Sequence, residues 1–262
     1  MQHASRRQFL GLAIAAGLAP RALAQAPRLG AAAPFSFEGL IADARQSASG
    51  PYVPTEIPQP DVLHAIDYDA HWRIRFREDQ SVVLHGGDAP VQFFHLGRYA
   101  REPVAIHVVE NGQAHELSYD PDMFEMPADS PARELTEGAG FAGFRVMRPG
   151  GAPDWLSFLG ASYFRCDGPQ AQYGLSARGI AIDTGLDRPE EFPRFTAFWL
   201  GEGERDGEFL TIWARLEGPS VAGAYRIGAK PKAEGGHTMT IDARLFMRHG
   251  VQRFGIAPLT SM

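Results

Sequence analysis

Residues 140–184 contain three short segments that decide the fold class. They read GFAGFR at 140–145, SFLGASYFR at 157–165 and YGLSARGIAIDT at 173–184. Apolar and polar side chains alternate within each segment, and Gly, Pro or Asp residues separate one segment from the next. A period of two is typical of half-buried β-strands, whose side chains point to opposite faces in turn. We therefore expect these segments to form adjacent strands.

The same segments are unusual in placing glycine and other small residues beside Tyr, Phe and Arg. Glycine weakens a strand unless a bulge or a close approach of two backbones requires it. Two interpretations stay open. The segments form a sandwich core with glycine bulges, or they line a groove in which aromatic rings and guanidinium groups hold a flat, hydroxyl-rich ligand.

The rest of the chain continues the strand pattern. Alternating or apolar runs predict strands at 72–77, 92–97, 104–110, 195–200, 209–216, 222–227 and 238–247. Asn111-Gly112 predicts a tight hairpin turn, because both turn positions need positive φ. One amphipathic helix is expected between Pro34 and Ser49, with Ser36 as its N-cap. Closely spaced strands in a chain with 29 Gly and 20 Pro predict an all-β, mainly antiparallel fold, a β-sandwich.

Composition limits the partners. The chain has 262 residues and a net charge of −6, which becomes −9 once Arg6, Arg7 and Arg21 are removed with residues 1–24. An acidic chain without a basic run argues against nucleic acid and anionic membrane as partners, and is compatible with neutral sugar. We find no dinucleotide fingerprint, P-loop or metal-ligand spacing, and expect no cofactor and no metal. The single cysteine, Cys166, is expected to be a buried, inert thiol.

The N-terminus has the pattern of an export signal. Arg6-Arg7 precedes a short apolar run, and Ala22-Leu23-Ala24 is a small-residue cleavage site. We expect cleavage after Ala24, with Ala26 as the alternative. The apolar run is too short to span a bilayer. The pattern predicts a twin-arginine signal at 1–24 followed by a linker at 25–34, a periplasmic location and no stable membrane insertion after signal removal.

These segments also carry a family resemblance. Together with Glu190-Glu191-Phe192-Pro193 and GIAPLTSM at 255–262, they resemble the periplasmic glucan biosynthesis proteins G and D (OpgG/OpgD, also called MdoG). The resemblance runs from about residue 35 to residue 262, and the twin-arginine signal favours the D type. It implies a large β-sandwich similar to the galactose-mutarotase type, here incomplete at its C-terminal end, without the family's immunoglobulin-like C-terminal domain.

The resemblance also implies a function. Family members are implicated in building osmoregulated periplasmic glucans, and some D-type members look like inverting endo-β-1,2-glucanases with catalytic aspartates. The resemblance places those aspartates beyond Met262, so no catalytic residue is carried over. The candidate functions are action on β-1,2-linked glucan backbones, a non-catalytic glucan-binding or scaffolding module, and a mutarotase-like epimerase. The implied partners are a β-glucan oligosaccharide or polysaccharide and a second chain that carries the missing C-terminal half.

Sugar-binding side chains are expected on the aromatic and Arg-containing strands. Sugar rings stack on aromatic faces, and sugar hydroxyls take hydrogen bonds from charged groups. The candidate substrate-binding residues are Tyr163, Arg165, Tyr173, Arg178 and Trp199. Of the acids near these strands, Asp183 stands out because it ends a strand, where Asp is usually a turn residue.

Overall fold

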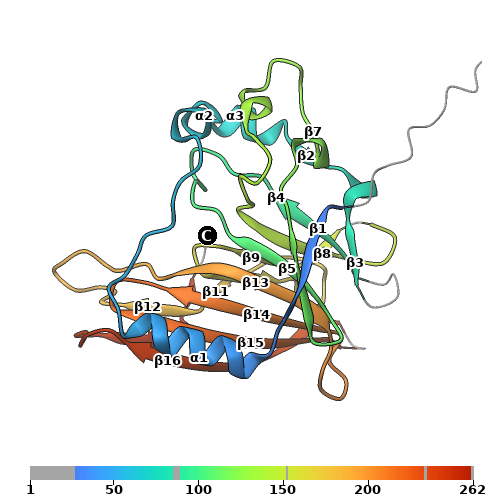
Figure 1. Ribbon diagram of the computed structural model, residues 1–262. Helices are drawn as coiled ribbons and strands as arrows, with labels where there is room; N and C mark the ends of the chain where they lie inside the picture. Colours follow the sequence, from blue (N-terminus) through green and yellow to red (C-terminus); the bar gives the residue numbers. More distant parts are fainter. Residues whose placement is uncertain (1–26, 85–88, 152, 233–234, 261–262) are drawn as a thin grey trace, which may run out of the picture.

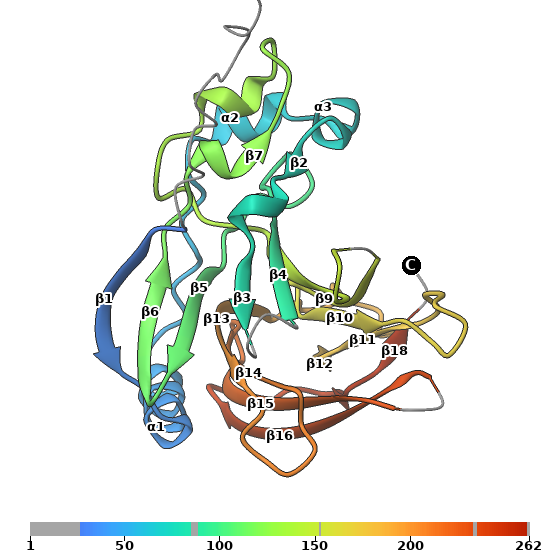
Figure 2. The same cartoon turned by 90° about the vertical axis from the view of Figure 1, so that its right-hand side faces the viewer.

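The computed structural model describes residues 27–84, 89–151, 153–232 and 235–260. Two sheets, each seven-stranded within the described residues, lie face to face as a sandwich, and α1 covers the outer face of one of them (Figures 1 and 2). Every strand pair within the two sheets is antiparallel except the parallel pair of β5 with β13. The predicted all-β, mainly antiparallel sandwich is therefore confirmed.

The first sheet has the order β1-β6-β5-β13-β14-β15-β16. Its strands are β1 (Leu29–Pro34), β5 (Ala105–Glu110), β6 (Gln113–Leu117), β13 (Arg194–Glu202), β14 (Leu210–Glu217), β15 (Val221–Pro231) and β16 (His237–Met247). Asn111 and Gly112 join β5 to β6 with φ of 51° and 73°, so the expected turn is confirmed.

The second sheet has the order β18-β11-β10-β9-β8-β4-β3. Its strands are β3 (Val82–Leu84), β4 (Ala89–Phe94), β8 (Gly143–Met147), β9 (Asp154–Leu159), β10 (Tyr163–Cys166), β11 (Ser176–Arg178) and β18 (Leu259–Thr260). The segments that decide the fold class are thus neighbours in one sheet, as expected. Two details differ: 157–165 is a hairpin rather than one strand, and 173–184 divides between β11 and β12 (Ile180–Ile182).

The smaller elements form a layer beside one end of the sandwich (Figure 1). They include α2 (Pro60–Ala65), α3 (Tyr68–Trp72), a small sheet of β2 (Arg75–Phe76) with β7 (Phe124–Glu125), and the 3₁₀ turns η1 (Glu78–Gln80), η3 (Pro121–Met123) and η4 (Pro131–Glu134). A second small sheet pairs β12 with β17 (Phe254–Ile256). Among the helices in the described residues, none is long and apolar enough to cross a membrane.

Aromatic rings fill the space between the two sheets. Phe144 and Phe158 of the second sheet stack with ring centroids 5.2 Å apart, and Phe198 of the first sheet meets Phe144 edge-on at 5.1 Å. Phe195 then contacts Phe198 and Tyr225. Offset and edge-on ring pairs add to the stabilisation from burial. This ring cluster sets the second sheet's inner face, and hence which of its side chains point outward.

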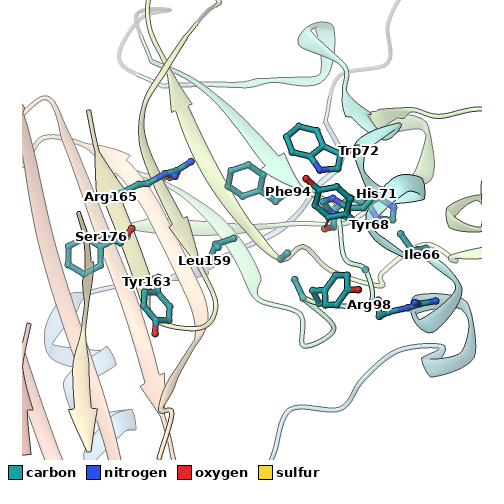
Figure 3. Close-up of a pocket in the computed structure, with 17 residues that line it drawn as sticks. Ile66, Tyr68, His71, Trp72, Phe94, Arg98, Leu159, Tyr163, Arg165 and Ser176 are labelled. Carbon is teal, nitrogen blue, oxygen red and sulfur yellow. Dashed lines mark hydrogen bonds between the residues drawn. The ribbon is translucent and has the colours of Figure 1, made fainter. Parts of the chain in front are cut away.

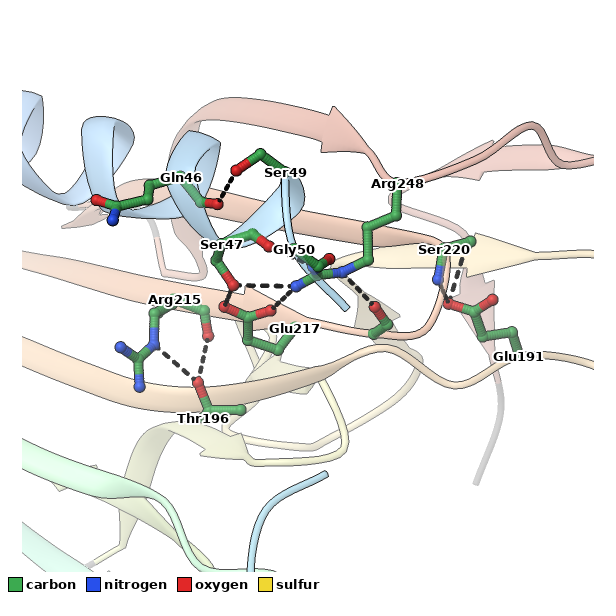
Figure 4. A network of polar contacts seen from close by, with 11 residues as sticks. Gln46, Ser47, Ser49, Gly50, Glu191, Thr196, Arg215, Glu217, Ser220 and Arg248 are labelled. Atoms are coloured by element: carbon green, nitrogen blue, oxygen red, sulfur yellow. Dashed lines mark hydrogen bonds and ion pairs between the residues drawn. The ribbon is translucent and has the colours of Figure 1, made fainter. Parts of the chain in front are cut away.

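The predicted helix is α1 (Phe37–Ala48), and its cap is confirmed: the Ser36 hydroxyl accepts a hydrogen bond from the Gly39 amide at 3.1 Å. Leu40 and Ala44 bury its apolar face against Trp213 and Ala224 of β14 and β15. The last turn is held by Arg248, which bonds Ser47 and Glu217 (Figure 4).

Two expectations for the N-terminal third are wrong. The proposed linker at 25–34 contains β1, which pairs with β6 from Leu29↔Leu117 to Pro34↔Gln113. All six of its residues are exposed, so backbone pairing forms this edge strand without an alternating pattern. The strand expected at 72–77 is only the two-residue β2 in this structure. Asp67 caps α3 by accepting a hydrogen bond from the Ala70 amide at 3.0 Å, and this helix includes Trp72, the first residue of the expected strand.

Candidate functional site

An open cleft of about 770 Å³ lies between the outer face of the second sheet and the α2–α3 layer (Figure 3). The sheet wall carries Leu159, Tyr163, Ser157, Arg165 and Ser176. Ile66, Tyr68, His71 and Trp72 form the opposite wall, and the loop after β4 adds Arg98 and Tyr99. These residues come from segments about a hundred positions apart in the sequence.

The strand register explains which side chains face the cleft. Arg165 of β10 is paired with Ser157 of β9, and Phe164 is paired with Phe158. Successive side chains point to opposite faces. Phe158 and Phe164 stack on each other in the core at 5.0 Å, so Ser157 and Arg165 point out of the core and line the cleft.

Exposed aromatic rings stand on the helical side. Tyr68 and Trp72 are 61% and 67% exposed, and their rings meet edge-on with centroids 5.9 Å apart. Tyr99 is 78% exposed. Between Tyr68 and Trp72, the His71 ring anchors α3 through a hydrogen bond of Nε2 to the backbone carbonyl of His95 at 3.1 Å. Rings held in this way and open to solvent suit stacking on the apolar face of a sugar.

Arg165 is oriented by two neighbours. Its guanidinium lies 4.2 Å from the centroid of the Tyr173 ring, and its Nε donates to the Ser157 hydroxyl at 3.4 Å. The Tyr173 hydroxyl in turn donates to the Asp154 carbonyl at 2.7 Å and to the Asp154 carboxylate. Burial, and then the bond to that carboxylate, raises the pKa of Tyr173. Tyr173 thus orients the Arg165 side chain by packing its ring against the guanidinium group.

Arg178 is buried beside the cleft. Its guanidinium lies between the Tyr163 ring at 5.4 Å and the Phe192 ring at 4.7 Å, and it forms an ion pair with Glu190. Burial raises the pKa of Glu190, but hydrogen bonds from Arg178 and Thr184 outweigh burial and hold that pKa below its usual range. Arg178 therefore packs against the Tyr163 ring, and Glu190 neutralises its charge.

Trp199 lies elsewhere. Its ring stacks on Phe35 with centroids 5.2 Å apart and on His107 at 4.7 Å, and it borders a separate hollow of about 540 Å³ beside the start of α1. The structure thus brings together Tyr163, Arg165, Tyr173 and Arg178, and places Trp199 on the other sheet.

Asp183 has the turn geometry expected of an Asp at a strand end. It adopts φ of 58°, and its carboxylate accepts from the Gln252 and Arg253 amides at 3.0 and 2.8 Å. Those amide bonds, led by the one from Arg253, together with the ion pair to Arg188, lower the pKa of Asp183. The residue therefore ties the end of β12 to the segment before β17.

Sequence reasoning missed Tyr68, Trp72, Tyr99 and Ser157. The spacing of Tyr68 and Trp72 at i and i+4 is a helical signal, but the alternating residues that follow favoured a strand. The export-signal residues Arg6, Arg7 and Ala24 lie outside the described residues.

Beneath the cleft, His95 is buried between two partners. Its Nδ1 lies 2.6 Å from the Leu96 carbonyl, to which it donates, so its Nε2 accepts from the Tyr119 hydroxyl at 2.9 Å. Burial lowers the pKa of His95 to about 4. The ring is therefore neutral in the folded protein throughout the neutral range.

His95 should make stability depend on pH. Between its ordinary pKa near 6.5 and its folded pKa of about 4, the unfolded chain binds a proton that the folded chain does not, so stability falls as pH falls through this window. Urea unfolding at pH 7 and pH 5 should show a loss of about 2 kcal/mol from this group. His95→Gln should remove that part of the loss, and exposed His249→Gln should keep it. Equal losses in His95→Gln and wild type would contradict the assignment.

The chain belongs to the family described as "Periplasmic glucan biosynthesis protein, MdoG", whose match covers residues 35–262. The family resemblance read from the sequence is therefore confirmed.

The chain is similar to proteins named glucans biosynthesis protein D. It is 47% identical over 261 residues to glucans biosynthesis protein D 2 of Ralstonia nicotianae, covering 95% of this chain and 48% of the relative. It is 41% identical over 240 residues to glucans biosynthesis protein D of Xanthomonas axonopodis pv. citri, covering 90% of this chain and 44% of the relative. The chain spans about half the length of the curated relatives it matches.

Proposed function

We propose that this chain serves periplasmic glucan biosynthesis by binding β-1,2-linked glucan backbones in the cleft between the second sheet and α3. The observation that carries the proposal is the set of exposed rings, Tyr68, Trp72 and Tyr99, across the cleft from Ser157 and Arg165. Rings on one wall can stack on pyranose faces, and the polar wall can bond hydroxyl groups. The family description and the names of the D-type relatives support the glucan as ligand.

Trp72→Ala tests the cleft directly. We expect this variant to bind linear β-1,2-glucan oligosaccharides roughly five- to tenfold more weakly than wild type in a calorimetric titration, because a ring stack is lost. Phe254→Ala, which truncates a half-exposed ring on β17 away from the cleft, is the matched control and should bind like wild type. Unchanged affinity in Trp72→Ala, or no binding to wild type, would refute the proposal.

The chain could either act on the bound glucan or only bind or scaffold it without turnover, and the pairing of the acids on and beside the second sheet favours the non-catalytic role for this chain. Glycoside hydrolysis requires two carboxylates free to act on the substrate. Asp154 accepts from Tyr173, Glu190 is paired with Arg178, and Asp167 is paired with Arg148 and His237. A reducing-end assay on linear β-1,2-glucan separates the two roles, since only hydrolysis creates new ends.

We also propose that the chain is exported to the periplasm through the signal that contains Arg6, Arg7 and Ala24. The order of twin arginines, apolar run and small-residue site supports export, and the family description names the same compartment. A neutral glucan suits a protein whose formal net charge is −6.

A further inference from the structure

Two arginines lie in one row across the outer face of the second sheet. Arg145 of β8 is paired with Ser157 of β9, and Ser157 is paired with Arg165 of β10. The three side chains share the face that is turned away from the core. Two strand spacings put the Cα atoms of the arginines about 10 Å apart, with the Ser157 hydroxyl between them. At the far side of Arg145, the same row continues into Gln92 of β4.

The partners of both arginines are neutral. Arg145 donates from Nη2 to the Gln92 side-chain oxygen at 2.7 Å, and its guanidinium lies 5.9 Å from the centroid of the Phe94 ring. Arg165 has Ser157 and the Tyr173 ring. In the part of the chain that the structure describes, neither arginine forms an ion pair with a carboxylate. The acid next along β9, Asp154, accepts a hydrogen bond from Tyr173 instead.

This arrangement has an electrostatic cost that a ligand can relieve. Arg145 and Arg165 lie on β8 and β10, the two strands that flank β9, and their like charges repel across β9; both arginines are only partly open to water. A polymer lying in the cleft removes more water from Arg165, and neutral hydroxyl groups leave its charge uncompensated. An oxyanion placed over Ser157 would accept charge-assisted hydrogen bonds from both sides.

We propose that the Arg145–Ser157–Arg165 row is a binding site for an anionic group, a carboxylate or phosphate ester, carried as a substituent on the glucan chain. The inference rests on the proposed glucan cleft and adds a substrate class to it. Phe94, Ser157 and Arg165 all line the cleft, so a chain stacked on Trp72 can present a substituent to the row.

The test compares two ligands of equal chain length, a neutral linear β-1,2-glucan oligosaccharide and its carboxymethylated form. In calorimetric titrations at low salt, the anionic form should bind wild type about tenfold more tightly. The advantage should shrink at about 1 M salt, where charges are screened beyond roughly 3 Å. A phosphorylated form of the same oligosaccharide then distinguishes the two kinds of anion.

Substitutions of the two arginines test whether the Arg145–Ser157–Arg165 row causes the tighter binding of the anionic ligand. Arg145→Gln should reduce the advantage of the anionic ligand and leave most of the neutral affinity. Arg165→Gln should also reduce that advantage, but it should weaken binding of the neutral ligand as well, because Arg165 lines the glucan cleft. Arg244→Gln, at an exposed position on β16, changes the net charge equally and should keep the advantage. Equal binding of both ligands by wild type would overturn the inference while leaving the glucan cleft intact. An advantage that survives in the Arg145→Gln/Arg165→Gln double variant would overturn the site, and failure of wild type to bind either ligand would overturn the proposed function itself.

Discussion

Arg248→Ala is expected to lower the free energy of unfolding by about 3–5 kcal/mol, the cost of breaking a buried ion pair from one side. The Arg248 guanidinium donates to the Glu217 carboxylate at 2.6 Å, to the Ser47 hydroxyl at 3.0 Å and to the carbonyls of Ser47, Gly50 and Gly218 (Figure 4). Alanine would leave Glu217 as a largely buried charge without its cation. It would also remove one donor from the Ser47 carbonyl, in the last turn of α1, and one from the Gly50 carbonyl just beyond it.

Urea unfolding measures this effect. Arg244→Ala is the matched control, because Arg244 is exposed and its guanidinium donates to the adjacent Ala243 carbonyl, and it should change stability by less than about 0.5 kcal/mol. Adding Glu217→Gln to Arg248→Ala should recover part of the loss, since it removes the stranded charge. A loss below about 1 kcal/mol for Arg248→Ala, or no recovery in the double variant, would show that the network does not fasten α1 to the sandwich.

Gly143→Ala should lower the free energy of unfolding nearly as much, by roughly 3 kcal/mol. A Cβ atom on Gly143 would lie 2.1 Å from the Phe158 carbonyl oxygen and 3.0 Å from the Leu159 Cα, so β8 and β9 could not keep their spacing. Gly143 is paired with Leu159 directly behind the cleft wall. The variant should therefore lose glucan affinity as well as stability.

Gly174→Ala is the control for this variant, because nothing lies within 4 Å of a Cβ at that position. In thermal unfolding, the midpoint of Gly143→Ala should lie far below that of wild type, and the midpoint of Gly174→Ala should lie close to it. Near-equal midpoints for the two variants would mean that the strands can separate without loss, contrary to the account of the close backbone approach.

Local signals predicted much of the fold. Alternation in the segments between residues 140 and 184 identified neighbouring strands of one sheet, and Gly143 occupies a close backbone approach of the kind that glycine in a strand suggests. Ser36 and Asn111-Gly112 fixed a helix start and a hairpin, because each acts on the backbone next to it. β1 could not be found in the same way, since it has only backbone pairing. The five-residue α3 was missed because the alternating residues that follow it favoured a strand.

The cleft was only half predictable. Tyr163, Arg165 and Tyr173 come together because they lie on or beside adjacent strands, which local alternation reveals. Tyr68 and Tyr99 reach the same cleft from an early segment through tertiary packing, which no local pattern encodes. Trp199 belongs to a strand with a similar pattern, but the sequence does not tell which sheet, or which face of it, that strand would occupy.

Amide hydrogen exchange with and without a linear β-1,2-glucan oligosaccharide tests the proposed glucan cleft most directly. Bound glucan should slow exchange in peptides that cover 66–72, 97–100 and 157–165, which form the two walls and the loop, and leave 241–247 on β16 unchanged. Protection confined to the hollow beside Trp199, or no protection at saturating glucan, would contradict it.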